Sequence, residues 1–159
     1  MIRIGHGYDV HRFAPDRALV LGGVRIDYEF GLDGHSDADV LLHAICDALL
    51  GSLALGDIGG HFPDSDPAYK NIDSMRLLAA CGEKIKERGF SLVNLDATVI
   101  AQKPKLAPYI GEMRRRIAEA LGADETAVSV KATTEEGLGF TGALEGIAAH
   151  AVVLVQNSD

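Results

Sequence analysis

The first residues of the chain, IRIGHGYDVHRF, alternate between two sets of side chains. A period of two is typical of a β-strand, so we predict a strand over residues 2–13. Asp9 and His11 fall on the same face of this strand, whereas His6 falls on the opposite face and is interpreted as a structural histidine. One set comprises Ile2, Ile4, His6, Tyr8 and Val10, and the other Arg3, Asp9, His11 and Phe13.

A hairpin and a helix are predicted next. Two short apolar runs flank Gly22-Gly23 within residues 18–27, and a Gly-Gly pair in that position is typical of a β-hairpin. Ser36, followed three residues later by Asp39, matches a capping box, so we predict a helix with Ser36 as its N-cap. The apolar positions of this helix recur at helical spacing and are Val40, Leu41, Ala44, Ile45, Ala48 and Leu49.

Two more helices and three more strands are predicted in the rest of the chain. Residues 57–71 show no periodicity and contain several glycine and proline residues, so they are predicted to form a long loop. The helices are expected over residues 73–88, ending at Gly89, and from Pro108 to Gly122. The strands are expected over residues 90–102, 127–134 and 147–156.

The last predicted strand, residues 147–156, is apolar on both faces, which favours a central position covered on both sides. The glycine-rich segment 135–146 before it is predicted to be a loop, and the three arginines at 114–116 a solvent-exposed helix face. The order of the elements favours an α+β fold, with a single domain over residues 1–159, a mixed sheet and helices packed on one face.

Composition limits the possible partners and locations. The 159 residues, 47% of them hydrophobic, suffice for one compact core. A net charge of -8 argues against a nucleic-acid partner, because affinity for the phosphate backbone needs a positive surface. Cys46 and Cys81 are interpreted as buried thiols in a reducing compartment. With no signal-peptide pattern and no apolar run of ~18 residues, we expect no membrane span and a cytoplasmic protein, or one of a plastid-type organelle whose transit peptide was removed.

Asp9 and His11 are candidate metal ligands. Residues i and i+2 of a strand project two donors from one face, and a catalytic zinc needs three protein donors and a free fourth position. His43 on the predicted helix is a candidate third donor, and Asp39 or Asp47 can accept the proton of its other ring nitrogen. Because a D-x-H sequence in a strand also occurs by chance, spacing alone leaves an edge strand and a metal site both open.

Three polar segments are candidate phosphate-binding sites, although ordinary local structure also explains each. His35 and Ser36 precede the predicted helix, whose N-terminus favours an anion, but Ser36 can equally be a cap alone. Hydroxyls and backbone N–H groups in KATTEEG can hold phosphate, and its carboxylates can hold a hard cation such as Mg²⁺. The lysines of AQKPK lie at another strand exit and are also typical of a solvent-facing loop.

Taken together, these segments carry a family resemblance. The sequence resembles the 2-C-methyl-D-erythritol 2,4-cyclodiphosphate synthase family over nearly its whole length, in GHGYDVHRF, LGGVRI, GLDGHSDADVLLHAICDALLGSLALGDIGGHFPDSDP, DATVIAQKPK and VKATTEEGLGFTGALEGIAAHAV. The resemblance implies an enzyme of the non-mevalonate isoprenoid pathway, which converts 4-diphosphocytidyl-2-C-methyl-D-erythritol 2-phosphate to the cyclic diphosphate and releases CMP. It also implies a homotrimer with active sites between subunits.

The same resemblance implies a role for each polar segment. The zinc ligands would be Asp9, His11 and His43. A second ion, Mg²⁺ or Mn²⁺, would bind at Glu136, and His35 with Thr134 would stabilise charge during the reaction. Contacts with the erythritol part are implied at Asp57, Ile58, Gly59, Phe62, Pro63, Asp64, Ser65 and Asp66. Other substrate contacts are implied at Ser36, Ala101, Lys103, Lys105, Leu106, Ala132, Thr133, Glu136 and Phe140.

The departure from the family pattern at Ala143 affects an expected ligand. Ala143 replaces an arginine that many members place in a cavity on the trimer axis, where it is linked to binding isoprenoid diphosphates. This weakens the expectation of such a ligand here, although Phe140 can keep part of an apolar lining. Two other functions stay open: a metal-dependent phosphohydrolase on a nucleotide-linked substrate, with water as the attacker, and a non-catalytic trimeric isoprenoid-binding protein. The complete set of candidate ligands argues against the second.

Overall fold

The molecule consists of one five-stranded sheet, a short hairpin and helices of different lengths. The computed structural model describes residues 1–157. The sheet is formed by β1 (Ile2–Ala14), β4 (Gly31–Leu32), β5 (Phe90–Ile100), β6 (Val128–Thr133) and β7 (Gly146–Asn157), and the hairpin by β2 (Leu19–Leu21) and β3 (Val24–Ile26). The helices are α1 (Val40–Ser52), α2 (Ile58–His61), α3 (Ser74–Glu87), α4 (Ile110–Leu121) and α5 (Gly139–Gly142).

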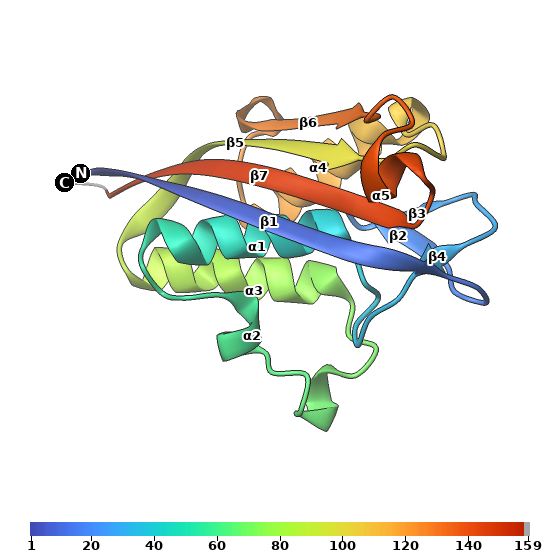
Figure 1. The fold of residues 1–159 in the computed structure, drawn as a ribbon. Coiled ribbons are helices and arrows are strands. Elements are labelled where there is room, and N and C mark those ends of the chain that lie inside the picture. Colours follow the sequence, from blue (N-terminus) through green and yellow to red (C-terminus); the bar gives the residue numbers. More distant parts are fainter. Residues whose placement is uncertain (158–159) are drawn as a thin grey trace.

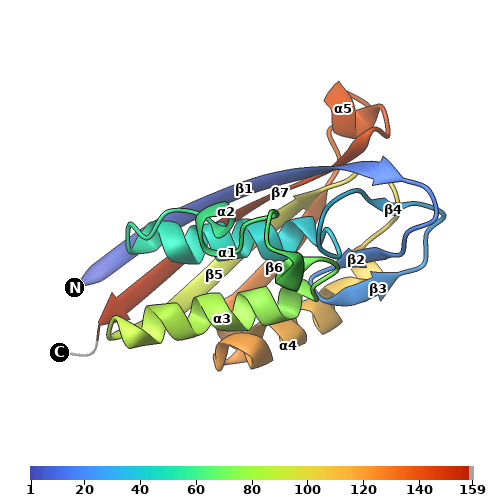
Figure 2. The same cartoon turned by 90° about the horizontal axis from the view of Figure 1, so that it is seen from below.

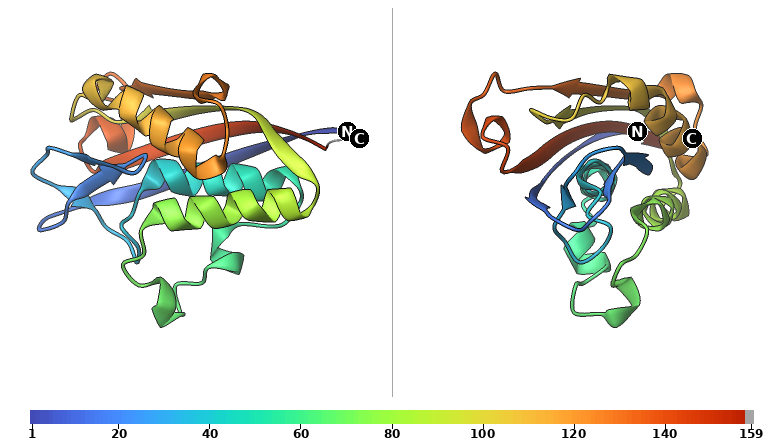
Figure 3. Two further views of the ribbon diagram at one scale, coloured as in Figure 1. Left: turned by 180° about the vertical axis from the view of Figure 1, so that it is seen from behind. Right: turned by 90° about the vertical axis from the view of Figure 1, so that its right-hand side faces the viewer.

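The sheet has the strand order β4-β1-β7-β5-β6. β5 and β6 are parallel and all other neighbours are antiparallel, so the sheet is mixed. α1 packs on β1 and β7, and α3 and α4 lie beside it on the same face of the sheet (Figure 1 and Figure 2). The segment between α1 and α3, which includes α2, projects on the side away from the sheet (Figure 3). The predicted α+β class and the one-sided placement of the helices are confirmed.

β7 lies at the centre of the sheet, as predicted, but its two faces differ. Ile147, Ala149 and Ala151 are buried on the face that meets α1. On the other face His150 is exposed and Val152 is 40% exposed. The prediction that both faces are covered is therefore wrong for the single chain, since its long helices cover only one face of the sheet.

Two glycines let α1 lie directly against β1. A Cβ atom on Gly7 would stand 1.9 Å from the carbonyl oxygen of Ala44, and one on Gly5 would stand 1.9 Å from that of Ala48. Any side chain at either position would hold the two elements apart, which is the usual reason for glycine inside a strand. The contact fixes the first turn of α1 next to the second half of β1.

The N-cap of α1 is Asp39, so the predicted capping box at Ser36 is wrong. The Asp39 carboxylate accepts a hydrogen bond from Leu42 N at 3.1 Å. It also accepts two bonds, of 3.0 and 2.8 Å, from backbone N–H groups in the turn between β2 and β3. Ala38 has a left-handed φ of 58°, which keeps Ser36 outside the helix. Asp39 therefore joins α1 to the hairpin.

Replacing Asp39 with alanine should strongly destabilise the protein. Asp39 is fully buried, and its loss leaves three backbone donors without their partner. A lost cap costs about 1 kcal/mol, and each unsatisfied buried donor adds about 1 kcal/mol or more, so we expect about 3 kcal/mol in a urea titration. Asp73→Ala is the matched control, because Asp73 caps α3 from an exposed position and should cost only about 1 kcal/mol. Equal losses in the two variants would contradict the joining role.

Other helix boundaries follow the sequence only in part. α3 and α4 end at Gly89 and Gly122, as predicted, where φ is 77° and 63°. The segment predicted as a loop over residues 57–71 contains α2 and a 3₁₀ turn, and the glycine-rich segment 135–146 contains α5. The helix predicted to begin at Pro108 starts with a 3₁₀ turn before α4. Among residues 1–157, no helix combines the length and apolar character that a membrane crossing requires.

The arginines of α4 do not all face solvent. Arg115 and Arg116 are exposed and form ion pairs with Glu112, as expected for a solvated face. Arg114 is half-buried and donates from Nε to the carbonyl oxygen of Val128 at 2.7 Å. Arg114 thus links α4 to the start of β6, a contact that the arginine run did not reveal.

Candidate active site

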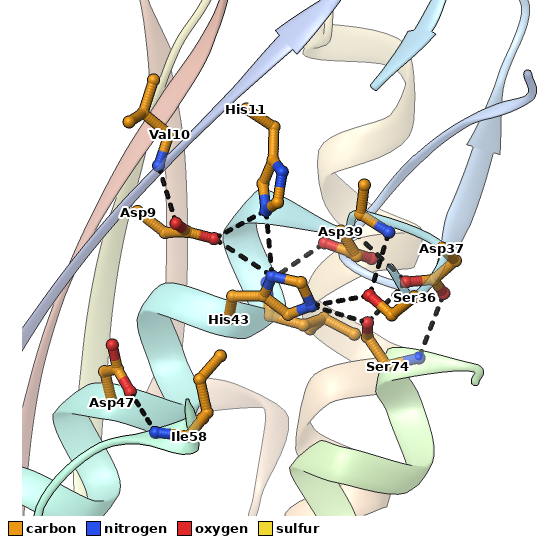
Figure 4. Close-up of polar contacts among 12 residues, drawn as sticks. Asp9, Val10, His11, Ser36, Asp37, Asp39, His43, Asp47, Ile58 and Ser74 are labelled. Atoms are coloured by element: carbon orange, nitrogen blue, oxygen red, sulfur yellow. Dashed lines mark hydrogen bonds and ion pairs between the residues drawn. The ribbon is translucent and has the colours of Figure 1, made fainter. Parts of the chain in front are cut away.

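Asp9, His11 and His43 converge between β1 and α1. Asp9 and His11 project from the strand toward the first turn of the helix, where His43 lies (Figure 4). Asp9 Oδ2 lies 3.0 Å from His11 Nε2 and 3.0 Å from His43 Nδ1, and the two ring nitrogens are 3.2 Å apart. The structure thus brings together the three donors that the sequence predicted. They come from β1 and α1, which are held close together by the contact at Gly5 and Gly7.

The geometry of this triad suits a metal ion. Tetrahedral zinc with bonds of about 2.0 to 2.1 Å places its ligand atoms about 3.3 Å apart, close to the separations found here. One carboxylate and two imidazoles also leave a fourth position open. Within residues 1–157, this is the only group of three such side chains whose donor atoms lie within 4.8 Å of one another. The residues therefore fit a divalent metal.

The ionised state of Asp9 favours metal binding, whereas the raised pKa of His11 opposes it, because a metal binds only the neutral imidazole. Burial by itself raises the pKa of Asp9, but hydrogen bonds with His11 and His43 hold that pKa well below its usual range. Burial lowers the pKa of His11, yet the hydrogen bond with Asp9 outweighs it and the net shift is upward. His11 Nδ1 donates to the carbonyl oxygen of Asp33 at 2.6 Å, which aims Nε2 at the triad.

The second ring nitrogen of His43 has unexpected partners. The sequence predicted Asp39 or Asp47, but Asp39 caps α1 and Asp47 accepts a bond from a backbone N–H of α2 at 2.8 Å. His43 Nε2 lies instead 3.0 Å from Ser74 Oγ and 3.2 Å from Ser36 Oγ. Ser74 was missed because it belongs to another helix, and no spacing rule connects it with His43.

A cavity of about 250 Å³ opens beside the triad. His35 and Ser36 form part of its wall, and Nε2 of His35 is buried without a hydrogen-bond partner among residues 1–157. The segment between α1 and α3 supplies another part of the wall. Of the contacts predicted there, those that line the cavity are Ile58, Gly59, Phe62 and Asp64.

Four other residues predicted in this segment lie outside the lining. Asp57 caps α2 by accepting from Gly60 N at 2.9 Å, and Asp66 accepts from Ala68 N at 2.9 Å in the following 3₁₀ turn. Their carboxylates therefore shape the segment in this structure. Pro63 and Ser65 also stand outside the cavity wall.

The remaining predicted substrate contacts form a second group, after β5 and β6. Ala101 N donates to Thr133 O at 3.0 Å and Gly137 N donates to Gln102 Oε1 at 3.0 Å, so the two segments lie side by side. Two predicted contacts, at Ala101 and Leu106, have buried side chains and offer only backbone groups. The exposed members are Lys103, Lys105, Ala132, Thr133, Thr134, Glu136 and Phe140.

Within one chain the two groups are apart. β7 and β5 separate β1 from β6, and no member of the second group lines the cavity beside the triad. Glu136 belongs to this second group and is not part of any three-donor cluster among residues 1–157. A single chain therefore does not bring all the predicted metal, catalytic and substrate-binding residues together in one site.

Relatives match this chain from end to end. The model of the YgbB family matches residues 2–156. The 2-C-methyl-D-erythritol 2,4-cyclodiphosphate synthase of Trichlorobacter lovleyi is 64% identical over 154 residues, which are 97% of this chain and 98% of that protein. The synthase of Halalkalibacterium halodurans is 62% identical over 155 residues, or 98% and 99% of the two chains.

Solved structures share the fold. The bifunctional IspDF of Campylobacter jejuni matches with a TM-score of 0.96 and 46% identity, over 100% of this chain and 43% of that longer one. The IspF of Plasmodium falciparum, solved as a CDP complex, matches with a TM-score of 0.88 and 34% identity, over 99% and 97% of the two chains.

Proposed function

Because this chain belongs to the YgbB family of 2-C-methyl-D-erythritol 2,4-cyclodiphosphate synthases, lyases of isoprenoid biosynthesis, we propose that it carries out their cyclisation. The substrate would be 4-diphosphocytidyl-2-C-methyl-D-erythritol 2-phosphate, and the products the 2,4-cyclodiphosphate and CMP. The observation that carries this proposal is the triad of Asp9, His11 and His43 at the wall of a cavity. Residues 1–159 would form a single synthase domain.

Zinc is the proposed occupant of the triad. One carboxylate and two imidazoles with an open fourth position match the donor set of a catalytic zinc site. A bound Zn²⁺ would supply positive charge that polarises a phosphate oxygen. The chain prepares the site by keeping Asp9 ionised and by aiming Nε2 of His11 inward through the bond to Asp33.

The reaction itself asks the chain mainly to bind and orient. An oxygen of the 2-phosphate attacks the β-phosphorus, and the bond from that phosphorus to CMP breaks. Both groups belong to one substrate, so holding it folded supplies much of the rate increase, and no covalent nucleophile is needed. His35 and Ser36 at the cavity wall would flank the reacting phosphates. His35 together with Thr134 would stabilise the developing negative charge.

A homotrimer with sites between subunits is part of the proposal. Residues 101–106 and 132–136 lie away from the cavity in one chain, so a neighbouring chain would have to supply them. They would hold the cytidine diphosphate part, and Glu136 would bind a second ion, Mg²⁺ or Mn²⁺. The face of the sheet that α1, α3 and α4 leave uncovered carries exposed apolar side chains. An exposed apolar patch favours burial against another protein surface, which supports association of this chain with further copies. The exposed members of the patch include Ile2, Ile4, Tyr8, Val10 and Val152.

Phosphorus NMR of the products tests the proposal. Incubation with the diphosphocytidyl substrate should give a cyclic diphosphate and CMP in equal amounts. The same protein stripped of metal by a chelator should be inactive until Zn²⁺ is restored. A linear phosphate product would contradict cyclisation and favour a phosphohydrolase that uses water as the attacker.

A further inference from the structure

The Nε2 atom of His43 lies within hydrogen-bonding distance of two buried hydroxyl groups, those of Ser74 and Ser36. Nδ1 points at Asp9 and His11, and Nε2 points the opposite way, toward Ser74 and Ser36 (Figure 4). Ser74 is completely buried and Ser36 is 8% exposed. A nitrogen in this surrounding must make its hydrogen bond within the protein.

Ser74 is itself held by a carboxylate. Its hydroxyl lies 2.5 Å from Oδ1 of Asp37, and its backbone N–H donates to Oδ2 of the same residue at 3.0 Å. An ionised carboxylate only accepts hydrogen bonds, and a serine hydroxyl has one proton to donate. That proton goes to Asp37, so Ser74 can offer His43 only a lone pair.

This direction bears on the second ring nitrogen of His43. Because Ser74 accepts from Nε2 at 3.0 Å, Nε2 must be the N–H of the ring. Nδ1 lies 3.0 Å from the Asp9 carboxylate, which also only accepts, so a metal ion bound at the triad would take the place of the hydrogen between them and face the lone pair of Nδ1. Ser36 Oγ accepts from Ala38 N at 3.1 Å and can either donate to Nε2 or accept from it, so Ser74 is the hydroxyl that requires an N–H there.

We infer that Ser74, oriented by Asp37, is a positioning residue that fixes His43 as an Nδ1 metal ligand. The inference rests on the proposed metal site and adds a carboxylate–hydroxyl–imidazole chain behind it. Partners of this kind set the orientation and basicity of a metal-bound histidine. This series of hydrogen bonds also joins two helices at the site, since Ser74 is the first residue of α3 and His43 lies in α1.

Zinc affinity measured against a chromophoric chelator tests the role of Ser74. Ser74→Ala should bind Zn²⁺ about 10- to 100-fold more weakly than the unchanged protein, the usual cost of losing such a partner. Ser52→Ala is the matched control, because Ser52 is a buried serine of α1 whose hydroxyl bonds only to Leu49 O, at 2.7 Å, among the described residues. It should keep its zinc affinity. Equal weakening in the two variants would overturn the inference.

Two further measurements distinguish a loss of His43 positioning from a general loosening of the fold. The Co²⁺-substituted protein should change its visible absorption bands in Ser74→Ala and keep them in Ser52→Ala, because of these two serines only Ser74 contacts the His43 ring. Asp37→Asn should weaken zinc binding in the same direction, and the double variant with Ser74→Ala should lose less than the product of the two single effects. Independent effects, or an unchanged cobalt spectrum in Ser74→Ala, would overturn the inference. If the unchanged protein binds no zinc, the proposed site itself fails first.

Discussion

His43→Ala is expected to lose both its zinc and nearly all of its cyclising activity. Removal of this imidazole leaves two donors, Asp9 and His11, on the same strand, and two donors hold zinc poorly. The charge that the metal contributes is worth several kcal/mol, so we expect a fall in rate of about a thousandfold or more. Elemental analysis of the purified protein and phosphorus NMR of the products measure the two losses.

A second histidine in the same stretch of sequence provides the control. His6 lies on the outer face of β1, where its ring nitrogen is 3.1 Å from that of His150, and it does not touch the triad. His6→Ala should therefore keep one zinc per chain. If His43→Ala retained zinc and activity, His43 would have to be removed from the site and the proposed zinc chemistry would be wrong.

The convergence of Asp9, His11 and His43 could be predicted in part, because local rules fix the face on which each side chain lies. The period of two places Asp9 and His11 on one face of β1. The helical pattern places His43 in the second turn of a helix capped at Ser36, and in the structure it lies in the first turn of α1. What periodicity could not show is that these two elements touch. That contact depends on Gly5 and Gly7, whose missing side chains let a helix backbone approach a strand.

The surroundings of the triad were predicted less well, because they depend on tertiary contacts. The sequence pattern makes Asp39 the second residue of a capping box, but Asp39 caps α1 itself and also binds the hairpin turn. The same pattern predicts Ser36 as the cap, whereas Ser36 forms part of the cavity wall. Ser74 resembles any serine after a helix cap, and only the packing of α3 against α1 brings it to His43.

Gly7→Ala is expected to disrupt both the fold and the proposed metal site. A Cβ atom at Gly7 would lie 1.9 Å from Ala44 O, and backbone atoms on both sides leave little freedom to move apart. We expect a loss of at least about 3 kcal/mol in the free energy of unfolding, the upper range for overpacking a core. Since Ala44 follows His43, the separation should also pull the helix away from Asp9 and His11.

Two other glycine variants isolate these effects. Gly111→Ala, in α4 with no atom within 4 Å of the added Cβ, should be neutral or up to about 1 kcal/mol more stable, because alanine favours a helix. Gly5→Ala creates the same clash one turn further along α1, at Ala48, and should destabilise the fold with a smaller loss of zinc affinity than Gly7→Ala. Urea titration and chelator competition measure both quantities. A folded Gly7→Ala protein that binds zinc as tightly as Gly5→Ala would show that the close contact at Ala44 does not set the distance between His43 and the ligands of β1.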